Sequence, residues 1–259
     1  MNYALITGAS KGIGRAIAEQ LAKRHINVLL VARSVDLLKE LAQQLRDNYK
    51  IDAKYLAIDL SLTTASHNIS NWISENNLPI NILVNNAGYG LSGAFTKYTF
   101  QQHSDMMQVN MTVPVHLTHL LLPILQKQPA SYILNIASSA AYQAVPGLSV
   151  YAATKSFVLS FSRGLKYELR NTNVSVTVVC PGATDTDFPN RADVTTEKAK
   201  KLAAKFNMQP KEVAEQAVNA MFAKKSEVVT GFVNKLNLFL AWLLPKKILE
   251  KAAADIYGL

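Results

Sequence analysis

The chain has 259 residues, of which 49% are hydrophobic and 17% are charged, and its formal net charge is +9. This length suffices for one sizeable core, and no linker, repeat or low-complexity tract divides it, so residues 1–259 are expected to form a single domain. The positive charge alone does not indicate nucleic-acid binding, because no DNA-reading helix or strand of interleaved aromatic and basic residues accompanies it.

The chain opens with an apolar strand and a glycine-rich turn. Residues 3–7 form a short apolar run, which predicts a buried parallel strand. The sequence Gly8-Ala-Ser-Lys-Gly12-Ile-Gly14 follows and gives way to good helix formers. A strand, a glycine turn and a helix N-terminus together make an anion site, because backbone N–H groups and the helix dipole face a phosphate. The alternative is a plain strand-to-helix turn, since a lone glycine pattern is weak evidence.

The second predicted strand, residues 27–32, ends at Arg33 and Ser34. In a dinucleotide-binding fold, an acidic residue at this position accepts the ribose 2′-hydroxyl of NAD, whereas an arginine pairs with the 2′-phosphate of NADP. Arg33 therefore favours NADP, and Lys11 in the glycine turn would add a second positive charge. The alternative is a surface arginine beside a helix that is N-capped by Ser34 and carries an apolar stripe at Val35, Leu37, Leu38, Leu41 and Leu45.

Polar motifs follow the later predicted strands. Asp59 and Leu60 come after the third strand, Asn85-Asn86-Ala87-Gly88 follows residues 80–84, Ser138 ends Asn135-Ile-Ala-Ser, and Pro181-Gly182-Ala-Thr184-Asp-Thr186 follows residues 174–180. Strands alternating with helices predict an α/β fold with a parallel sheet and helices on both faces. Ligands bind such sheets at the carboxyl ends of the strands, so these motifs are expected at one edge.

Tyr151 and Lys155 are four residues apart in Tyr151-Ala-Ala-Thr-Lys155. On a helix these positions share a face, so Lys155 would hold its charge near the Tyr151 hydroxyl. A nearby cation favours the phenolate, and we expect it to lower the pKa of Tyr151 from about 10, which suits a proton donor and acceptor. Alone, this spacing is common on solvated helix faces.

Taken together, these motifs resemble the classical short-chain dehydrogenase/reductase family over most of the chain. The resemblance implies a single doubly wound Rossmann-type domain and a catalytic tetrad of Asn110, Ser138, Tyr151 and Lys155. It also implies an NADP(H) site, with cofactor contacts from Tyr151, Lys155 and the following residues: Gly8, Ser10, Lys11, Gly12, Ile13, Gly14, Arg33, Ser34, Asp59, Leu60, Asn86, Ala87, Gly88, Pro181, Gly182, Thr184 and Thr186.

The implied activity is hydride transfer between NADP(H) and a carbonyl or alcohol, with Tyr151 as general acid/base. Lys155 would bond the nicotinamide ribose, Ser138 would orient the carbonyl oxygen, and Asn110 would hold a water beside Lys155. Two alternatives stay open: an epimerase or dehydratase on the same fold, and a catalytically silent NADP-binding regulatory protein. The silent protein would have no need for Ser138, Tyr151 and Lys155 together.

The resemblance places the substrate among residues 89–95, residues 140–148 and a lid at about 187–207. Their apolar side chains indicate a hydrophobic ketone, aldehyde or acyl substrate; they are Tyr89, Leu91, Phe95, Tyr142, Val145, Leu148 and Phe188. Lysines cluster in the lid, at Lys198, Lys200, Lys201 and Lys205. They could attract the phosphate of an acyl thioester carrier, although a solvated helix face explains them more simply.

The C-terminal segment departs from the family pattern. An apolar helix is expected over about 232–257, and its core, residues 236–244, is too short to span a bilayer. Because Lys235, Lys246 and Lys247 flank this core, a peripheral membrane contact is one interpretation, and a dimer-forming or pocket-covering helix is the other. The family implies a homodimer or homotetramer, but the usual tetramer-building ending is replaced here.

Few features point to secretion or metal binding. Met1 and Asn2 lead directly into the first predicted strand, so we expect no signal peptide. Cys180 is the only cysteine and cannot form an internal disulfide, which indicates a reducing compartment, the cytoplasm. The five histidines show no pairing with acidic or cysteine ligands at site spacing, so we expect no metal.

Overall fold

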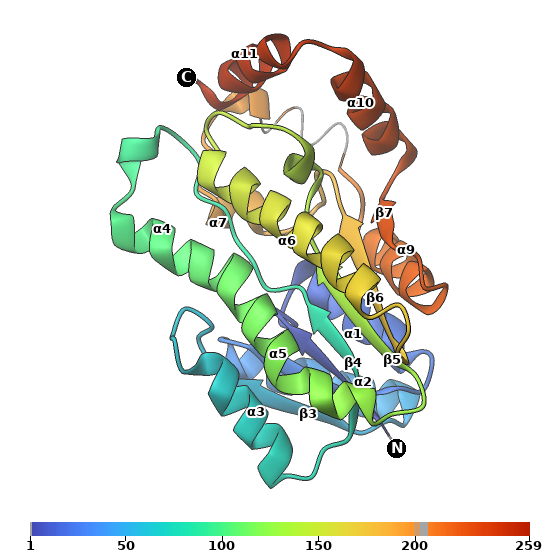
Figure 1. The fold of residues 1–259 in the computed structure, drawn as a ribbon. Helices are drawn as coiled ribbons and strands as arrows, with labels where there is room; N and C mark the ends of the chain where they lie inside the picture. Colours follow the sequence, from blue (N-terminus) through green and yellow to red (C-terminus); the bar gives the residue numbers. More distant parts are fainter. Residues whose placement is uncertain (1, 200, 202–206) are drawn as a thin grey trace.

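A computed structural model describes residues 2–199, 201 and 207–259 and contains a seven-stranded parallel sheet (Figure 1). The strand order is β3-β2-β1-β4-β5-β6-β7. The strands are β1 Tyr3–Thr7, β2 Asn27–Ala32, β3 Ala53–Ala57, β4 Ile80–Asn85, β5 Ser131–Ile136, β6 Val174–Cys180 and β7 Glu227–Val229. The inner strands are continuous apolar runs because helices cover both of their faces, and Leu5 of β1 pairs with Leu29 and Leu83 on its two sides.

Helices pack on the two faces of the sheet through separate apolar cores. One core joins the sheet to α1, α2 and α9, and the other joins it to α3, α5 and α6. In Figure 1, α5 and α6 lie in front of the sheet and α1 and α2 behind it. The bounds are α1 Gly12–Ala22, α2 Val35–Tyr49, α3 Ala65–Glu75, α4 Phe100–Met107, α5 Val113–Gln126, α6 Ser149–Glu168 and α9 Pro210–Phe222. The predicted doubly wound fold with helices on both faces is confirmed.

The order in which strands are added to the sheet reverses between β1 and β4, and hydrogen bonds join the ends of these two strands. The chain adds β2 and β3 on one side of β1 and then returns to place β4 on the other side. The Thr7 hydroxyl accepts hydrogen bonds from the backbone N–H groups of Asn86 and Ala87, at 3.0 and 3.1 Å. In return, the Asn86 amide donates to the Thr7 carbonyl at 2.9 Å. These bonds fix the loops after β1 and β4 against each other at the switch point, where ligands bind in this fold class.

The C-terminal segment forms two helices instead of the single helix expected over about 232–257. Helix α10 covers Phe232–Leu243 and α11 covers Lys246–Tyr257. Pro245 separates them because proline has no N–H to continue the helical ladder. None of the described helices is long and apolar enough to span a bilayer.

The expected lid begins with the short helix α7, Phe188–Arg191. Its continuation includes residues 200 and 202–206, so Lys200 and Lys205 lie outside the described residues. Lys198 pairs with Asp255, and the Thr196 hydroxyl donates to the Ile256 carbonyl at 2.8 Å. Thr196 and Lys198, within the segment expected to form the lid, are therefore fastened to α11.

Candidate active site

A cavity of about 960 Å³ lies along the carboxyl edge of the sheet. Its walls come from the loops that follow the strands, from α6 and from described residues of the segment expected to form the lid. The cofactor residues expected from the sequence line it, with the exception of Gly14: Gly8, Ser10, Lys11, Gly12, Ile13, Arg33, Ser34, Asp59, Leu60, Asn86, Ala87, Gly88, Tyr151, Lys155, Pro181, Gly182, Thr184 and Thr186. Ser138 lines it too.

The glycine turn forms a cradle at one end of the cavity. Gly8 and Gly12 have φ angles of +67° and +57°, which side chains disfavour, and a Cβ on Gly8 would lie 2.8 Å from the Asn86 amide nitrogen. Helix α1 begins at Gly12, and its N-cap residue Lys11 makes no side-chain capping bond. The helix N-terminus therefore faces the cavity with N–H groups and a positive dipole, as a phosphate requires.

Gly14 does not line the cavity but is needed for packing. A Cβ at this position would lie 2.3 Å from the Gly8 carbonyl oxygen and 2.4 Å from the Asn86 amide nitrogen. Real Cβ atoms do not approach so closely, so only glycine lets α1 rest against the cradle.

Arg33 and Asp59 stand at the far end of the cradle, after β2 and β3. One Arg33 guanidinium nitrogen lies 3.9 Å from an Asp59 carboxylate oxygen, and the Arg33 side chain is 61% exposed. The backbone N–H of Ser61 is the main cause of a lowered Asp59 pKa, and Arg33 adds to the effect. The Ser34 side chain makes no capping bond, although its carbonyl accepts from Leu38 in the first turn of α2. The fixed positive charge of Arg33 thus faces the cavity from its rim.

Tyr151 and Lys155 both face the cavity from α6. The Lys155 Nζ lies 5.8 Å from the centroid of the Tyr151 ring and donates to the Ile136 carbonyl at 2.9 Å. Both residues are buried. The Ser138 hydroxyl accepts from the Ala140 N–H at 3.1 Å and also hydrogen-bonds the Tyr151 side chain.

The expected lowering of the Tyr151 pKa by Lys155 is wrong for this structure. Burial raises the pKa of Tyr151 to about 12, because it disfavours the phenolate more than the hydrogen bond from Ser138 favours it. Burial also lowers the pKa of Lys155 from 10.5 to about 8. Tyr151 is therefore a protonated phenol at neutral pH.

Asn110 lies behind the cavity wall, in a single π-helical stretch between α4 and α5, Gln108–Thr112. Its amide donates to the Tyr89 carbonyl at 2.9 Å and to the Thr154 hydroxyl at 3.0 Å, and it accepts from the Tyr89 N–H at 3.1 Å. Thr154 in turn donates to the Tyr151 carbonyl at 2.7 Å. Asn110 therefore ties the loop after β4 to the helix that carries Tyr151.

Four of the seven apolar residues expected around the substrate line the cavity: Tyr89, Leu91, Leu148 and Phe188. The Phe188 ring lies 5.2 Å from the Tyr151 ring. The expectation was wrong for Tyr142, which bonds Glu227 of β7, and for Val145, which is buried in the cluster beneath the cavity.

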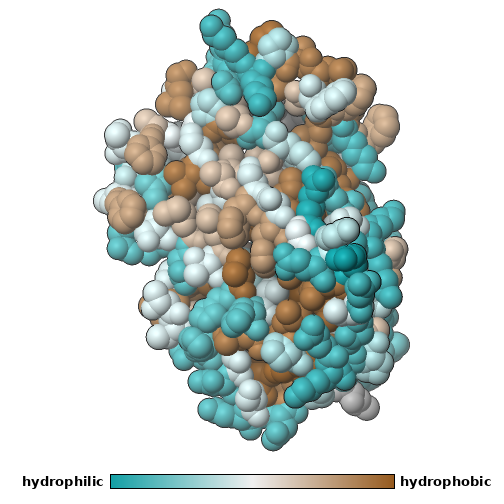
Figure 2. Space-filling view, in the orientation of Figure 1, coloured by the Kyte–Doolittle hydropathy of each residue, from teal (hydrophilic) through white to brown (hydrophobic). Residues whose placement is uncertain are grey.

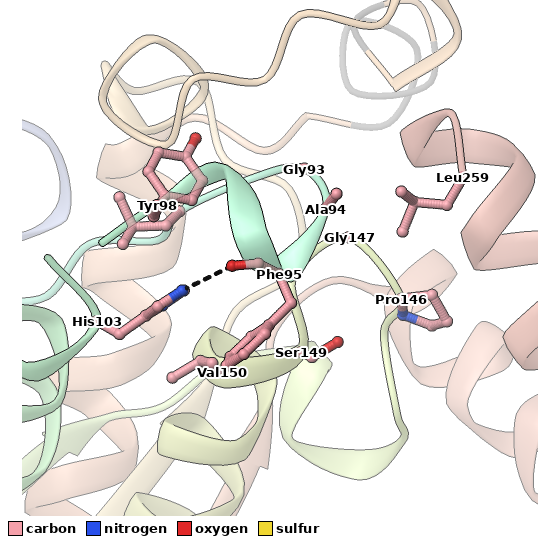
Figure 3. A pocket seen from close by; sticks show the side chains of 11 residues that line it. Gly93, Ala94, Phe95, Tyr98, His103, Pro146, Gly147, Ser149, Val150 and Leu259 are labelled. Carbon is pink, nitrogen blue, oxygen red and sulfur yellow. Dashed lines mark hydrogen bonds between the residues drawn. The ribbon is translucent and has the colours of Figure 1, made fainter. Parts of the chain in front are cut away.

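Phe95 was also expected in the cavity, but it lines a separate pocket of about 170 Å³ (Figure 3). Its ring stacks on His103 at 5.1 Å, and the His103 Nε2 lies 3.2 Å from the Phe95 carbonyl oxygen. Leu259, the last residue, borders the same pocket.

Sequence reasoning missed Tyr257, which lines the cavity from the end of α11. Gly147 makes room for it, since a Cβ on Gly147 would lie 2.5 Å from the Tyr257 Cβ. Ala253, one turn earlier, is buried against Leu148 and Tyr151. A pocket-covering helix was one interpretation of residues 232–257, but no signal in the sequence singled out Tyr257.

Two further groups bear on the chemistry. Cys180 is buried, and burial raises the pKa of its thiol to about 11, so it is a structural residue and not a nucleophile. Within the described parts of the chain, no three histidine, cysteine or acidic side chains meet as metal ligands.

The sequence profile of the short chain dehydrogenases matches residues 2–198. An uncharacterized oxidoreductase of Staphylococcus epidermidis is 34% identical over 195 residues, which covers 75% of this chain and 83% of that protein. The ketoacyl reductase HetN of a Nostoc species is 31% identical over 255 residues, covering 94% of this chain and 85% of HetN.

Two solved structures share the fold. A short-chain dehydrogenase from Sphingobium yanoikuyae in complex with NADPH superposes with a TM-score of 0.82 at 28% identity, covering 95% of this chain and 97% of its own. A dehydrogenase from Burkholderia phymatum in complex with NAD has a TM-score of 0.83 at 23% identity and covers 93% of each chain, a likeness of fold alone.

Proposed function

This chain belongs to the short-chain dehydrogenase family, and we propose that it interconverts a carbonyl group and the corresponding alcohol with NADP(H) as hydride carrier. The observation that carries the proposal is the meeting of Ser138, Tyr151 and Lys155 on one wall of a cavity whose other end is a glycine cradle at a helix N-terminus. The cradle can hold a phosphate, and the buried Tyr151 can donate a proton. Together they suit a cavity that binds a dinucleotide and a carbonyl substrate side by side.

The cradle residues around Gly8 and Gly12 would hold the pyrophosphate, and Pro181, Gly182, Thr184 and Thr186 would hold the nicotinamide end. When bound there, NADPH supplies a hydride for a carbonyl carbon. Lys155 fits a role at the nicotinamide ribose, because a Cβ on Gly88 would lie 3.1 Å from its Nζ and glycine leaves that space open.

Tyr151 would donate the proton that the carbonyl oxygen needs as it becomes an alkoxide. Its raised pKa keeps the phenol protonated at neutral pH, which favours the reductive direction. Ser138 would donate a hydrogen bond to the same oxygen and so orient it. Asn110 would act as a positioning residue, because its bonds run to Tyr89 and Thr154 and not to the cavity.

The preference for NADP over NAD rests on Arg33. The side chain at the end of β2 is basic, and Arg33 lies beside Asp59 at the cavity rim. Arg33→Ala is expected to raise the KM for NADPH roughly 10- to 100-fold and to leave the KM for NADH unchanged, since a hydrogen bond to a charged group contributes about 1.5–3 kcal/mol. A clear preference of the wild type for NADH would overturn this assignment.

The substrate class follows from the apolar wall of Tyr89, Leu91, Leu148, Phe188 and Tyr257. We propose a hydrophobic ketone, aldehyde or 3-oxoacyl group, and the similarity to a ketoacyl reductase supports the acyl option. We further propose that residues 1–259 act as one domain with a lid at about 187–207, in the cytoplasm.

The test is NADPH and NADH consumption against hydrophobic ketones, aldehydes and 3-oxoacyl thioesters. NADPH-dependent turnover of at least one class is expected. Tight NADPH binding without turnover of any carbonyl would contradict the proposal and favour a silent cofactor-binding protein.

A further inference from the structure

Helix α10 exposes an almost continuous apolar face. We call this the docking face: Phe232, Leu236, Phe239, Leu240, Trp242 and Leu243. All six side chains are exposed, and those of Phe232 and Trp242 are 80% and 79% accessible. Figure 2 shows hydrophobic side chains gathered over α10 at the upper right of the molecule. Soluble proteins seldom leave so many large apolar side chains together in water, so this face is expected to meet a partner.

The inner side of α10 packs against the protein. This packing explains where the helix lies but not why its outer side is apolar. Asn234, Leu238 and Ala241 are half-buried and recur at helical spacing, so they form the side that rests on the protein. No residue of α10 is fully buried. Packing against the rest of the chain therefore leaves the docking face outward.

The charges around the docking face identify the kind of partner. Lys235 lies within α10 and Lys246 and Lys247 follow it, whereas residues 228–249 contain no aspartate or glutamate. A second copy joined face to face about a twofold axis would bring these lysines against one another without a compensating carboxylate. Each of these lysines would instead stabilise binding to an anionic surface.

We propose that α10 docks this protein on the surface of an anionic phospholipid bilayer. The docking face would enter the boundary between headgroups and acyl chains, with Trp242 at that boundary and the lysines on the phosphates. Helix α10 has 12 residues, about 18 Å of helix, and cannot cross a hydrocarbon core of about 30 Å. It therefore lies on the membrane and does not span it.

The segment formed by α10 and α11 also covers the proposed active site. At its start, Asn234 packs against Gly182, so closely that a Cβ on Gly182 would lie 2.2 Å from the Asn234 Oδ1. At its end, Tyr257 lines the cavity, and α11 holds the lid through Asp255 and Ile256. A lipophilic carbonyl compound dissolved in the bilayer would then reach the cavity from the membrane side. This consequence rests on the proposed function, whereas docking itself does not.

Sedimentation of the full chain with vesicles tests the docking. Vesicles of phosphatidylcholine containing one part in about three of phosphatidylserine should pellet the protein, and pure phosphatidylcholine should pellet much less. The double variant Lys246→Gln/Lys247→Gln should bind the anionic vesicles roughly 25-fold more weakly. Trp242→Ser should weaken binding on the order of tenfold, whereas Phe100→Ser, whose side chain is equally exposed at 80% on α4, should leave it unchanged.

Fluorescence gives a readout that does not depend on pelleting. The chain has two tryptophans, and in a Trp72→Phe background the emission of Trp242 should shift to the blue with anionic vesicles only. Wild-type protein that stays in the supernatant with both vesicle types, or equal losses for Trp242→Ser and Phe100→Ser, would overturn the docking. A solution dimer that dissociates on Trp242→Ser would also overturn it and assign the face to a second copy.

A kinetic measurement tests the route of the substrate. Anionic vesicles should lower the KM for a long-chain ketone and leave that for a short, water-soluble ketone unchanged. If both KM values respond alike while the protein still binds the vesicles, substrate entry from the bilayer is refuted. Absence of all carbonyl turnover, with docking intact, would instead count against the proposed function.

Discussion

Replacing Lys155 with methionine should make the stability of the protein depend differently on pH. The Lys155 ammonium is buried, and burial lowers its pKa from 10.5 to about 8. The difference between these values, at about 1.4 kcal/mol per pH unit, is a destabilisation of about 3 kcal/mol. Methionine has similar length and no charge, so the variant lacks this penalty.

The direction in which the free energy of unfolding changes with pH follows from which state, folded or unfolded, keeps the Lys155 proton. Between pH 8 and 10.5 the unfolded chain keeps the Lys155 proton that the folded chain has released, so the free energy of unfolding of the wild type rises with pH in this window. Below pH 8 the penalty is complete, and above pH 10.5 it is gone. Other titrating groups are shared by both proteins and largely cancel in the comparison.

Urea unfolding of both proteins at pH values from 7 to 10.5 measures the effect. The free energy of unfolding of Lys155→Met relative to that of the wild type should fall by about 3 kcal/mol across this range. The loss of the bond to the Ile136 carbonyl adds a constant that does not change the slope. A difference that stays constant with pH would refute the assigned pKa and with it the picture of a desolvated, charged lysine in the cavity wall.

Three further changes probe the site. Gly14→Ala should cost about 3 kcal/mol or more of stability by urea unfolding, because its Cβ would meet the Gly8 carbonyl oxygen at 2.3 Å; a stable variant would contradict the packing of α1 on the cradle. Asn110→Ala should destabilise by about 3 kcal/mol, measured in the same way, because it removes the partners of both Tyr89 backbone groups; an unchanged stability would show that these bonds are not needed. Tyr257→Ala should lower the KM for bulky ketones roughly tenfold relative to small ones, and an unaltered ratio would exclude this side chain from substrate contact.

Much of the fold could be read from the sequence because local patterns agree with the final packing. The buried strand 3–7 appears as β1 and the apolar run 174–180 as β6, since helices on both faces demand uninterrupted hydrophobic residues. The polar motifs follow strand ends, and parallel strands bring those ends to one edge. The cavity therefore gathers residues such as Arg33, Asp59 and Ser138, which are far apart in the chain.

The substrate side could not be read in the same way because it depends on long-range contacts. Tyr142 and Leu148 both follow Ser138 closely, yet only Leu148 faces the cavity, and Tyr142 turns to Glu227 of β7. Tyr257 reaches the cavity from the opposite end of the chain. The sequence showed a positive charge near Tyr151 but not how completely that phenol is buried, and burial decides its pKa.

The most direct test of the proposed chemistry is the turnover of Tyr151→Phe on the best carbonyl substrate with saturating NADPH. The change keeps the ring beside Phe188 and removes only the hydroxyl. Tyr257→Phe is the matched control, because it removes a hydroxyl from another tyrosine that lines the same cavity. We predict that Tyr151→Phe lowers kcat by roughly 10²- to 10⁴-fold with NADPH affinity unchanged, while Tyr257→Phe retains activity. Near wild-type turnover by Tyr151→Phe would contradict its role as the proton donor.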